Sequence, residues 1–205
     1  MLKRNIRILL YSSNIWYLGE GMFAPIFGIF TQKIGGNILD ISGIWAAYLI
    51  ATGIFTILVG RLSDRNISKA KLMVIGYALN AFFTFCYLFV SSQLSLFLVQ
   101  VGLGIASALA TPTWNALYAQ YEDRSKAGQI WGMADGQSKV MTGVAVVLGG
   151  VIVNWLSFNT LFFAMGIIQV IATLYSVQLL TQQKNAAKLS SKKGVARRER
   201  LNASN

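Results

Sequence analysis

Hydrophobic residues fall into six long stretches along the chain, and polar residues are concentrated between them. Each stretch holds about 20 mostly apolar residues, the length that an α-helix needs to cross a bilayer. The third stretch is apolar on every face of a helix, which is not typical of a water-facing amphipathic helix. The pattern predicts an all-α polytopic membrane protein with six transmembrane helices, at residues 8–30, 41–59, 72–90, 94–119, 130–155 and 161–180.

The connections between these spans are too short to fold into a separate soluble domain. We therefore expect one membrane bundle over residues 1–181. Residues 182–205 differ, because they are rich in Lys and Arg and contain almost no large apolar side chains. This composition predicts a disordered basic tail that is attracted to anionic lipid.

Composition supports a membrane protein. Of the 205 residues, 55% are hydrophobic and 12% are charged, whereas a soluble domain has about 25% charged residues. The chain has no His and one Cys, which excludes Ser-His-Asp triads, His/Cys zinc sites and disulfide scaffolds. It also lacks the Gly-rich phosphate loop of nucleotide-driven proteins. We therefore predict no metal, no cofactor and no enzymatic activity.

The basic residues lie mainly on one side of the predicted spans. Sixteen of the 18 lie on the side of the N-terminus: three before the first span, four in the second connection, two in the fourth and seven in the tail. Lys33 lies on the other side, and Lys139 lies inside the fifth span. The positive-inside rule then places both termini in the cytoplasm. The net charge of +11 therefore needs no nucleic-acid partner, and we expect an integral protein of the plasma (inner) membrane.

The N-terminus begins with basic residues and continues into an apolar stretch, as a secretory signal peptide does. However, Trp16, Tyr17 and Glu20 stand where a cleavage site of small residues would be needed. We therefore expect an uncleaved first span.

The second connection carries a motif. It reads GRLSDRNISKAK over residues 60–71 and lies between the second and third spans, on the predicted cytoplasmic side. It resembles the cytoplasmic loop signature of the major facilitator superfamily, G-x-L-x-D-R-x-(G)-(R/K)-(K/R). The simpler alternative is an ordinary basic loop with a turn. The residues that carry the resemblance are Gly60, Arg61, Asp64, Arg65 and Lys69.

The chemistry of these positions can be stated without the family. Gly60 has no Cβ, so it could let helix ends approach closely. Asp64 could cap the N-terminus of an adjacent helix. Arg65 and Lys69 could pair with Asp64, with anionic lipid or with the acidic residues of the fourth connection. In the family this loop latches the two halves in the outward-facing state, and the resemblance implies the same role here.

Other segments resemble the family less closely. Residues 19–25 look like its Gly-rich, Pro-containing first helix. Gln100 stands where many members have an Arg that is linked to proton coupling. Ala145 and Val146 stand where the antiporter signature has Gly-Pro. The sequence therefore gives no support to coupling through residue 100 and little support to antiport.

The resemblance covers residues 8–180, which correspond to the N-terminal six-helix half of a fold that usually has twelve spans. It implies a secondary transporter, or half of one, that moves a small solute by alternating access between two bundles. One bundle cannot enclose the pathway alone, so we expect either a homodimer or a missing second half. The alternative is a non-transporting membrane scaffold or regulatory subunit derived from such a half.

Ionisable residues inside a bilayer cost about 2.5–3.5 kcal/mol, so they are expected to face a cavity or a partner. Asp135 and Lys139 are four residues apart and could pair on one helix face; alternatively they line the pathway. Glu20 has no charged neighbour on its own helix, and a desolvated carboxyl group can carry a proton. Glu20 is a candidate proton carrier or partner for a cationic substrate. It could also be a neutral acid bonded to another helix, or pair with Lys139.

Neutral polar residues inside the spans have a similar ambiguity, because they could contact substrate or bond another helix. Asn80 and Gln137 belong to this group. The ring of Trp114 could likewise contact a substrate. Small residues at 102, 104, 106 and 108 predict close helix packing, and Pro25 predicts a kink. The candidate pathway residues are Asn14, Glu20, Gln100, Asn115, Asp135 and Lys139.

Overall fold

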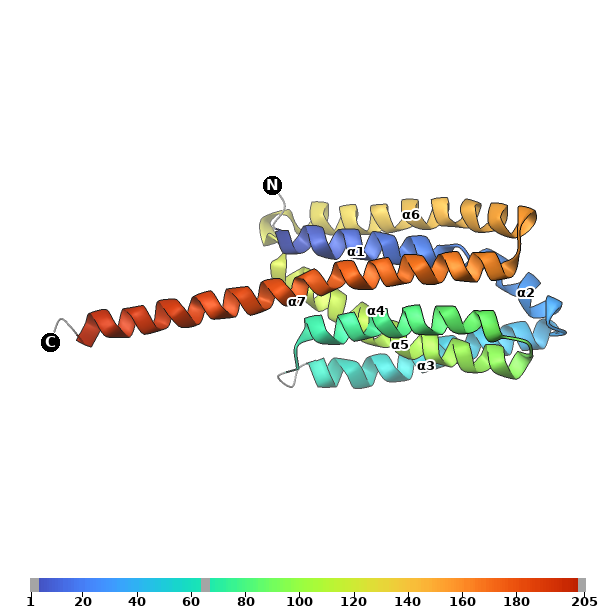
Figure 1. Cartoon of the computed structure of the whole chain (residues 1–205), viewed down its shortest axis with the longest axis horizontal. Helices are drawn as coiled ribbons and strands as arrows, with labels where there is room; N and C mark the ends of the chain where they lie inside the picture. The colour runs from blue at the N-terminus through green and yellow to red at the C-terminus, as the bar shows by residue number, and fades with distance from the viewer. Residues whose placement is uncertain (1–3, 64–66, 203–205) are drawn as a thin grey trace.

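The structure is a computed structural model that describes the backbone of residues 4–63 and 67–202, and side chains as far as residue 182. Within this part the protein contains helices and no strand. The helices lie side by side in one bundle, and the last one extends well beyond it (Figure 1). The predicted all-α membrane bundle is confirmed.

Six segments cross the bundle, and they correspond to the six predicted spans. Those from α3 to α7 each contain a helix that is long and apolar enough to cross a membrane by length and composition. The segments are α1 (Arg4–Gly21) with η1 (Ala24–Ile26) and α2 (Phe27–Lys33); α3 (Ile38–Ser63); α4 (Lys69–Cys86) with η2 (Tyr87–Phe89); α5 (Gln93–Tyr121); α6 (Ala127–Trp155), preceded by η3 (Arg124–Lys126); and α7 (Phe158–Asn202).

The first span is broken, which corrects the prediction of one helix over residues 8–30. Its α-helix ends at Gly21, and a 3-10 turn that contains Pro25 leads into α2. Proline has no backbone N–H to donate within a helix. The turn is closed instead by Ile26 N–H, which donates to Phe23 O at 3.0 Å. The kink expected at Pro25 is therefore a complete interruption of the helix.

The six segments pack as two similar groups of three. Helix α1 packs against α6 and α7, and α5 packs in the same way against α3 and α4. The two groups meet where α4 packs against α7 and where α1 contacts α5. Figure 1 shows α6 and α3 at opposite edges of the bundle. In each of these flanking helices only 17% of the most apolar window is buried inside the chain, so most of their surface is left for lipid or for another bundle.

Small residues allow α5 to approach its neighbours closely. A Cβ added to Gly104 would lie 2.7 Å from Tyr48 O of α3. A Cβ added to Gly76 of α4 would lie 2.7 Å from the backbone nitrogen of Ala110. Both distances are shorter than real carbon contacts, so neither position tolerates a side chain without movement of the backbone. The predicted close packing around the fourth span is confirmed.

The break in the first span lies against α6. A Cβ added to Gly149 would overlap the carbonyl group of Met22, and one added to Gly21 would lie 2.8 Å from Cβ of Ala145. Ala145 is fully buried. Ala145, which stands where the antiporter signature has Gly, is thus part of a packing contact between α6 and the end of α1.

Two clusters of buried apolar side chains fill the bundle. One lies toward the N-terminal end of α1 and includes Leu9, Met73 and Tyr118. The other lies toward the break and is largely aromatic, with Phe23 and Phe162 at its centre. The polar groups described below lie along α1, beside these clusters.

Helix α7 continues to Asn202 over 45 residues. The composition of residues 182–205 predicts disorder, whereas the backbone is helical as far as Asn202. Ala, Lys, Arg and Leu make up much of this segment, and all four favour a helix. Its Lys and Arg side chains lie outside the described part of the structure.

Candidate functional site

The loop motif lies at the end of the bundle that contains the N-terminus. Gly60 and Arg61 belong to the last turns of α3, and Lys69 begins α4. Asp64 and Arg65 lie outside the described residues. A Cβ added to Gly60 would meet nothing within 4 Å. The expectation that Gly60 lets two helix ends of this chain approach closely is therefore wrong for the part of the chain that the structure describes.

Asn14 connects α1 to the flanking helix α6. Its Nδ2–H donates to Gln137 Oε1 at 3.0 Å, and both side chains are half-buried. Of the two alternatives for these residues, the structure shows the bond between helices. This bond holds α6 on the side of α1 where the cavities described below open.

Asp135 and Lys139 are both exposed on α6. The described residues contain no ion pair between them, so the structure does not form this alternative. A separation of four residues permits such a contact, but it does not fix the two long side chains in one geometry. Two uncompensated charges on a membrane helix need water or a partner. Because both side chains are exposed, this water or partner must contact a surface of α6 that the described part of the chain does not cover.

Glu20 lies near the end of α1 and bonds to α4. Its Oε1 accepts Nδ2–H of Asn80 at 2.5 Å, and Asn80 is fully buried. The Oδ1 atom of Asn80 accepts the hydroxyl of Thr84 at 3.5 Å. The structure thus selects the bond to a neighbouring helix. The alternative pairing of Glu20 with Lys139 is not formed in the described structure.

A cavity borders this carboxyl group. It brings together Glu20 and Gln100, two of the predicted pathway residues that are far apart in the sequence. Gln100 is 3% exposed, and it enters from α5. The cavity lies among α1, α3, α4, α5 and α7, and the remaining lining residues are Phe23, Ala24, Trp45, Tyr48, Thr84, Tyr87, Leu103 and Met165.

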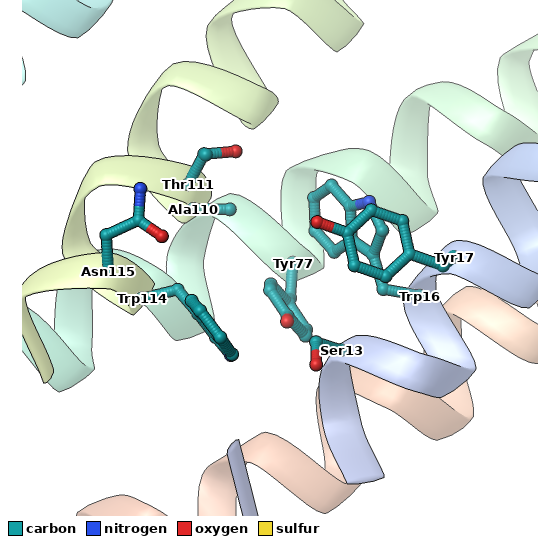
Figure 2. Close-up of a pocket in the computed structure, with 8 residues that line it drawn as sticks. All are labelled: Ser13, Trp16, Tyr17, Tyr77, Ala110, Thr111, Trp114 and Asn115. Atoms are coloured by element: carbon teal, nitrogen blue, oxygen red, sulfur yellow. The ribbon is translucent and has the colours of Figure 1, made fainter. Parts of the chain in front are cut away.

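Another cavity lies nearer the N-terminal end of α1 and is the first of the two along that helix. Figure 2 shows Tyr17 of α1 and Asn115 of α5 reaching toward the same space, with the rings of Tyr77 and Trp114 between them. Asn115 is exposed. The other lining residues are Ser13, Trp16, Ala110 and Thr111.

Trp114 is held by its own chain. Its Nε1–H donates to Leu9 O at 3.1 Å, and its ring stacks on Tyr118 with centroids 4.6 Å apart. The ring therefore already has an aromatic partner on one face. It forms a fixed wall of this first cavity.

The two cavities follow one another along α1. Residues 13, 16 and 17 line the first, and residues 20, 23 and 24 line the second. Glu20, Gln100 and Asn115 are among the predicted pathway residues, whereas the tyrosines that line the cavities are not. Tyr17 and Glu20 are three residues apart on one helix face, which was the available signal. Tyr48 and Trp45 lie one turn apart on α3 in the same way.

Gln169 was also missed. It is 1% exposed on α7, and its Nε2–H donates to Trp16 O at 3.1 Å. Its Oε1 is buried and has no hydrogen-bond partner in the described structure. The signal was an amide in an otherwise apolar span. Gln169 fixes α7 against the part of α1 that lies between the two cavities.

Comparison with known proteins gives a consistent result. Residues 9–202 match the sequence model of the Major Facilitator Superfamily. An uncharacterized MFS-type transporter of Methanocaldococcus jannaschii is 27% identical over 195 residues, which cover 94% of this chain and 50% of that protein. An uncharacterized MFS-type transporter of Bacillus subtilis is 21% identical over 158 residues, covering 77% of this chain and 96% of that protein.

The chain therefore spans about half the length of the archaeal relative and nearly all of the bacterial one. The family match extends over both halves of the repeated helix packing, from α1 to α7. It also includes the loop motif of residues 60–71, on which the resemblance was first based. This chain belongs to the major facilitator superfamily.

Proposed function

We propose that this chain is a secondary transporter, or one half of one, that moves a small solute across the membrane by alternating access. The observation that supports this most directly is the pair of cavities in series along α1, both lined by polar and aromatic side chains. A scaffold needs close helix packing, but it has no need of a row of cavities through its interior.

In this proposal a solute enters from the cytoplasm at the cavity of Tyr17 and Asn115 and then moves to the cavity of Glu20. A second bundle covers the side of α1 and α5, and rocking of one bundle against the other opens the pathway to each side in turn. The exposed charges of Asp135 and Lys139 on α6 face that second bundle or the water between the two.

The second bundle is another copy of this chain or a separate six-span half. Helices α3 and α6 flank α1 and α5 and are little buried inside this chain, which supports a partner bundle on the α1–α5 side. The distribution of Lys and Arg supports a cytoplasmic location for both termini, in the plasma (inner) membrane. Loop 60–71 then lies in the cytoplasm, where Asp64 and Arg65 act in the latch between the bundles.

Solute counterflow tests the transport proposal. The purified full chain is placed in proteoliposomes loaded with an excess of one unlabelled solute, and uptake of the labelled solute is followed. The panel contains a sugar, an amino acid, an organic anion and an organic cation. We expect transient accumulation for one class, and its loss in Asn115→Leu, which fills the first cavity.

Gln120→Leu is the matched control, because Gln120 is exposed on the same helix outside both cavities. It should keep the activity of the wild type. Asp64→Asn should insert normally and lose counterflow. If well-folded wild-type protein forms dimers in the bilayer and no class of solute shows counterflow, the transport proposal fails and the scaffold alternative replaces it.

A further inference from the structure

The cavity around Glu20 has an unusual combination of side chains. Four aromatic residues, Phe23, Trp45, Tyr48 and Tyr87, line it together with the carboxyl group of Glu20. No Lys or Arg is among its lining residues. The faces of aromatic rings carry partial negative charge, so they attract cations, as a carboxylate does. The lining is therefore suited to a positively charged occupant and unsuited to an anion.

The rings are fixed by their neighbours. Tyr87 stacks on Phe162 with centroids 4.8 Å apart, and Phe23 meets Tyr87 edge-on at 5.0 Å. The ring centroids of Trp45 and Tyr48, both on α3, lie 5.4 Å apart. A wall of this kind is already ordered before a ligand arrives, so little conformational freedom is lost on binding.

The carboxyl group has unused capacity. Asn80 donates to Oε1, while no hydrogen bond to Oε2 is formed by any residue in the described structure. The buried polar atoms that lack a partner there belong to Gln169 and Gln182, so Oε2 is not sealed off from the cavity. Among the described residues, a neutral amide is the single hydrogen-bonding partner of this carboxyl group and no counter-ion accompanies it.

We propose that this cavity binds a small organic cation of the alkylammonium or quaternary ammonium type. The cationic group lies at Glu20 and against the rings of Trp45, Tyr48 and Tyr87, and the apolar part contacts Phe23. The transport of this cation rests on the proposed function, but its binding does not, because every lining residue belongs to this chain.

The test uses two probes that differ only in charge. Choline and its neutral isostere 3,3-dimethylbutan-1-ol are titrated into the purified full chain, and binding is measured by calorimetry and by displacement of labelled choline. We expect choline to bind at least about tenfold more tightly than the isostere. In Glu20→Gln the affinity for choline should fall about tenfold or more, while that for the isostere changes less than about twofold.

Each substitution has a matched control. Glu20→Gln keeps an oxygen that can accept from Asn80. Its control, Glu122→Gln, removes the same charge from the loop before α6, outside the cavity.

Trp45→Leu removes one of the aromatic rings that line the cavity and should lower the affinity for choline about threefold or more. Trp155→Leu removes a tryptophan that is 80% exposed at the end of α6 and should have no effect. Trp45→Leu also keeps the inference testable if Glu20→Gln fails to fold.

The outcomes separate this inference from the transport proposal. Equal binding of choline and its isostere, or unchanged choline affinity in Glu20→Gln, overturns the inference. The second result would also favour a proton-carrying role for Glu20. If choline binds as expected and no solute of the panel shows counterflow with the dimer, the site stands and the transport proposal fails. If another class of solute shows counterflow and choline does not bind, the transport proposal stands and this inference fails.

Discussion

Gly149 makes one of the tightest contacts in the described structure, because its Cα faces the carbonyl group of Met22 where the first span breaks. We predict that Gly149→Ala destabilises the protein by about 1–3 kcal/mol, since the added methyl group must push two backbones apart. Unfolding in mixed micelles with increasing SDS measures the change. The preference of a helix for Ala over Gly acts in the opposite direction, by about 1 kcal/mol.

Gly143 provides the control for this prediction. It lies on the same helix, and a Cβ there would meet nothing within 4 Å. Gly143→Ala should therefore be neutral or slightly stabilising. Equal loss of stability in both variants would mean that α6 does not pack against the break in the way described.

The sequence identified residues with unusual chemistry, but not their partners. Glu20 stands out because a carboxyl group inside a span is rare. Its bond to Asn80 depends on how α1 and α4 pack, which no local pattern contains. Trp45 was not expected at the site, because Trp near the end of a span is typical of an interface anchor. The pairing of Asp135 with Lys139 is absent from the described structure for a related reason, since spacing permits a contact without requiring it.

At the scale of elements, five of the six spans could be predicted because about 20 apolar residues are enough to define each of them. The first span differs. Its two glycines and Pro25 gave a signal for a kink, but the complete break also depends on the close approach of Gly149 from another helix. The helical extension of α7 was missed because charge composition was read as disorder, although its residue types favour a helix.

The pairing of α4 with α5 can be tested at Gly76. A Cβ there would lie 2.7 Å from the backbone nitrogen of Ala110 and 2.8 Å from Ala106 O. We predict that Gly76→Leu separates the two helices, with a loss of at least about 1–3 kcal/mol. The measurement is the SDS fraction at which half of the protein unfolds.

Gly53→Leu is the corresponding change on α3, where the glycine is exposed and nothing lies within 4 Å of the added Cβ. It should shift the stability by no more than about 0.5 kcal/mol. A large effect of Gly53→Leu would indicate that α3 is covered there by a partner absent from the bundle. A small effect of Gly76→Leu would contradict the described contact between α4 and α5.

At the scale of the whole molecule, the sequence could predict one helical bundle, because the number of spans depends on composition alone. The orientation inferred from the charge distribution stays a prediction. The sequence could not predict which helices line the interior. That information comes from the packing, in which α1 and α5 occupy equivalent positions and α3 and α6 flank them. The two cavities along α1 follow from this arrangement, and they lie beside the surface that a second bundle would cover.

If the second bundle is another copy, the chain should be a dimer in a bilayer, and its α1–α5 side should face the same side of its partner. Subunit counting by photobleaching of labelled chain should then give two steps. Thr111 lines the first cavity. In a background where the single cysteine, Cys86, is replaced by Ser, Thr111→Cys should cross-link the two copies through a flexible bis-maleimide. Phe82→Cys, 60% exposed on α4, should not cross-link. One photobleaching step together with cross-linking at neither position would exclude the homodimer, and the pathway would then need a separate six-span chain.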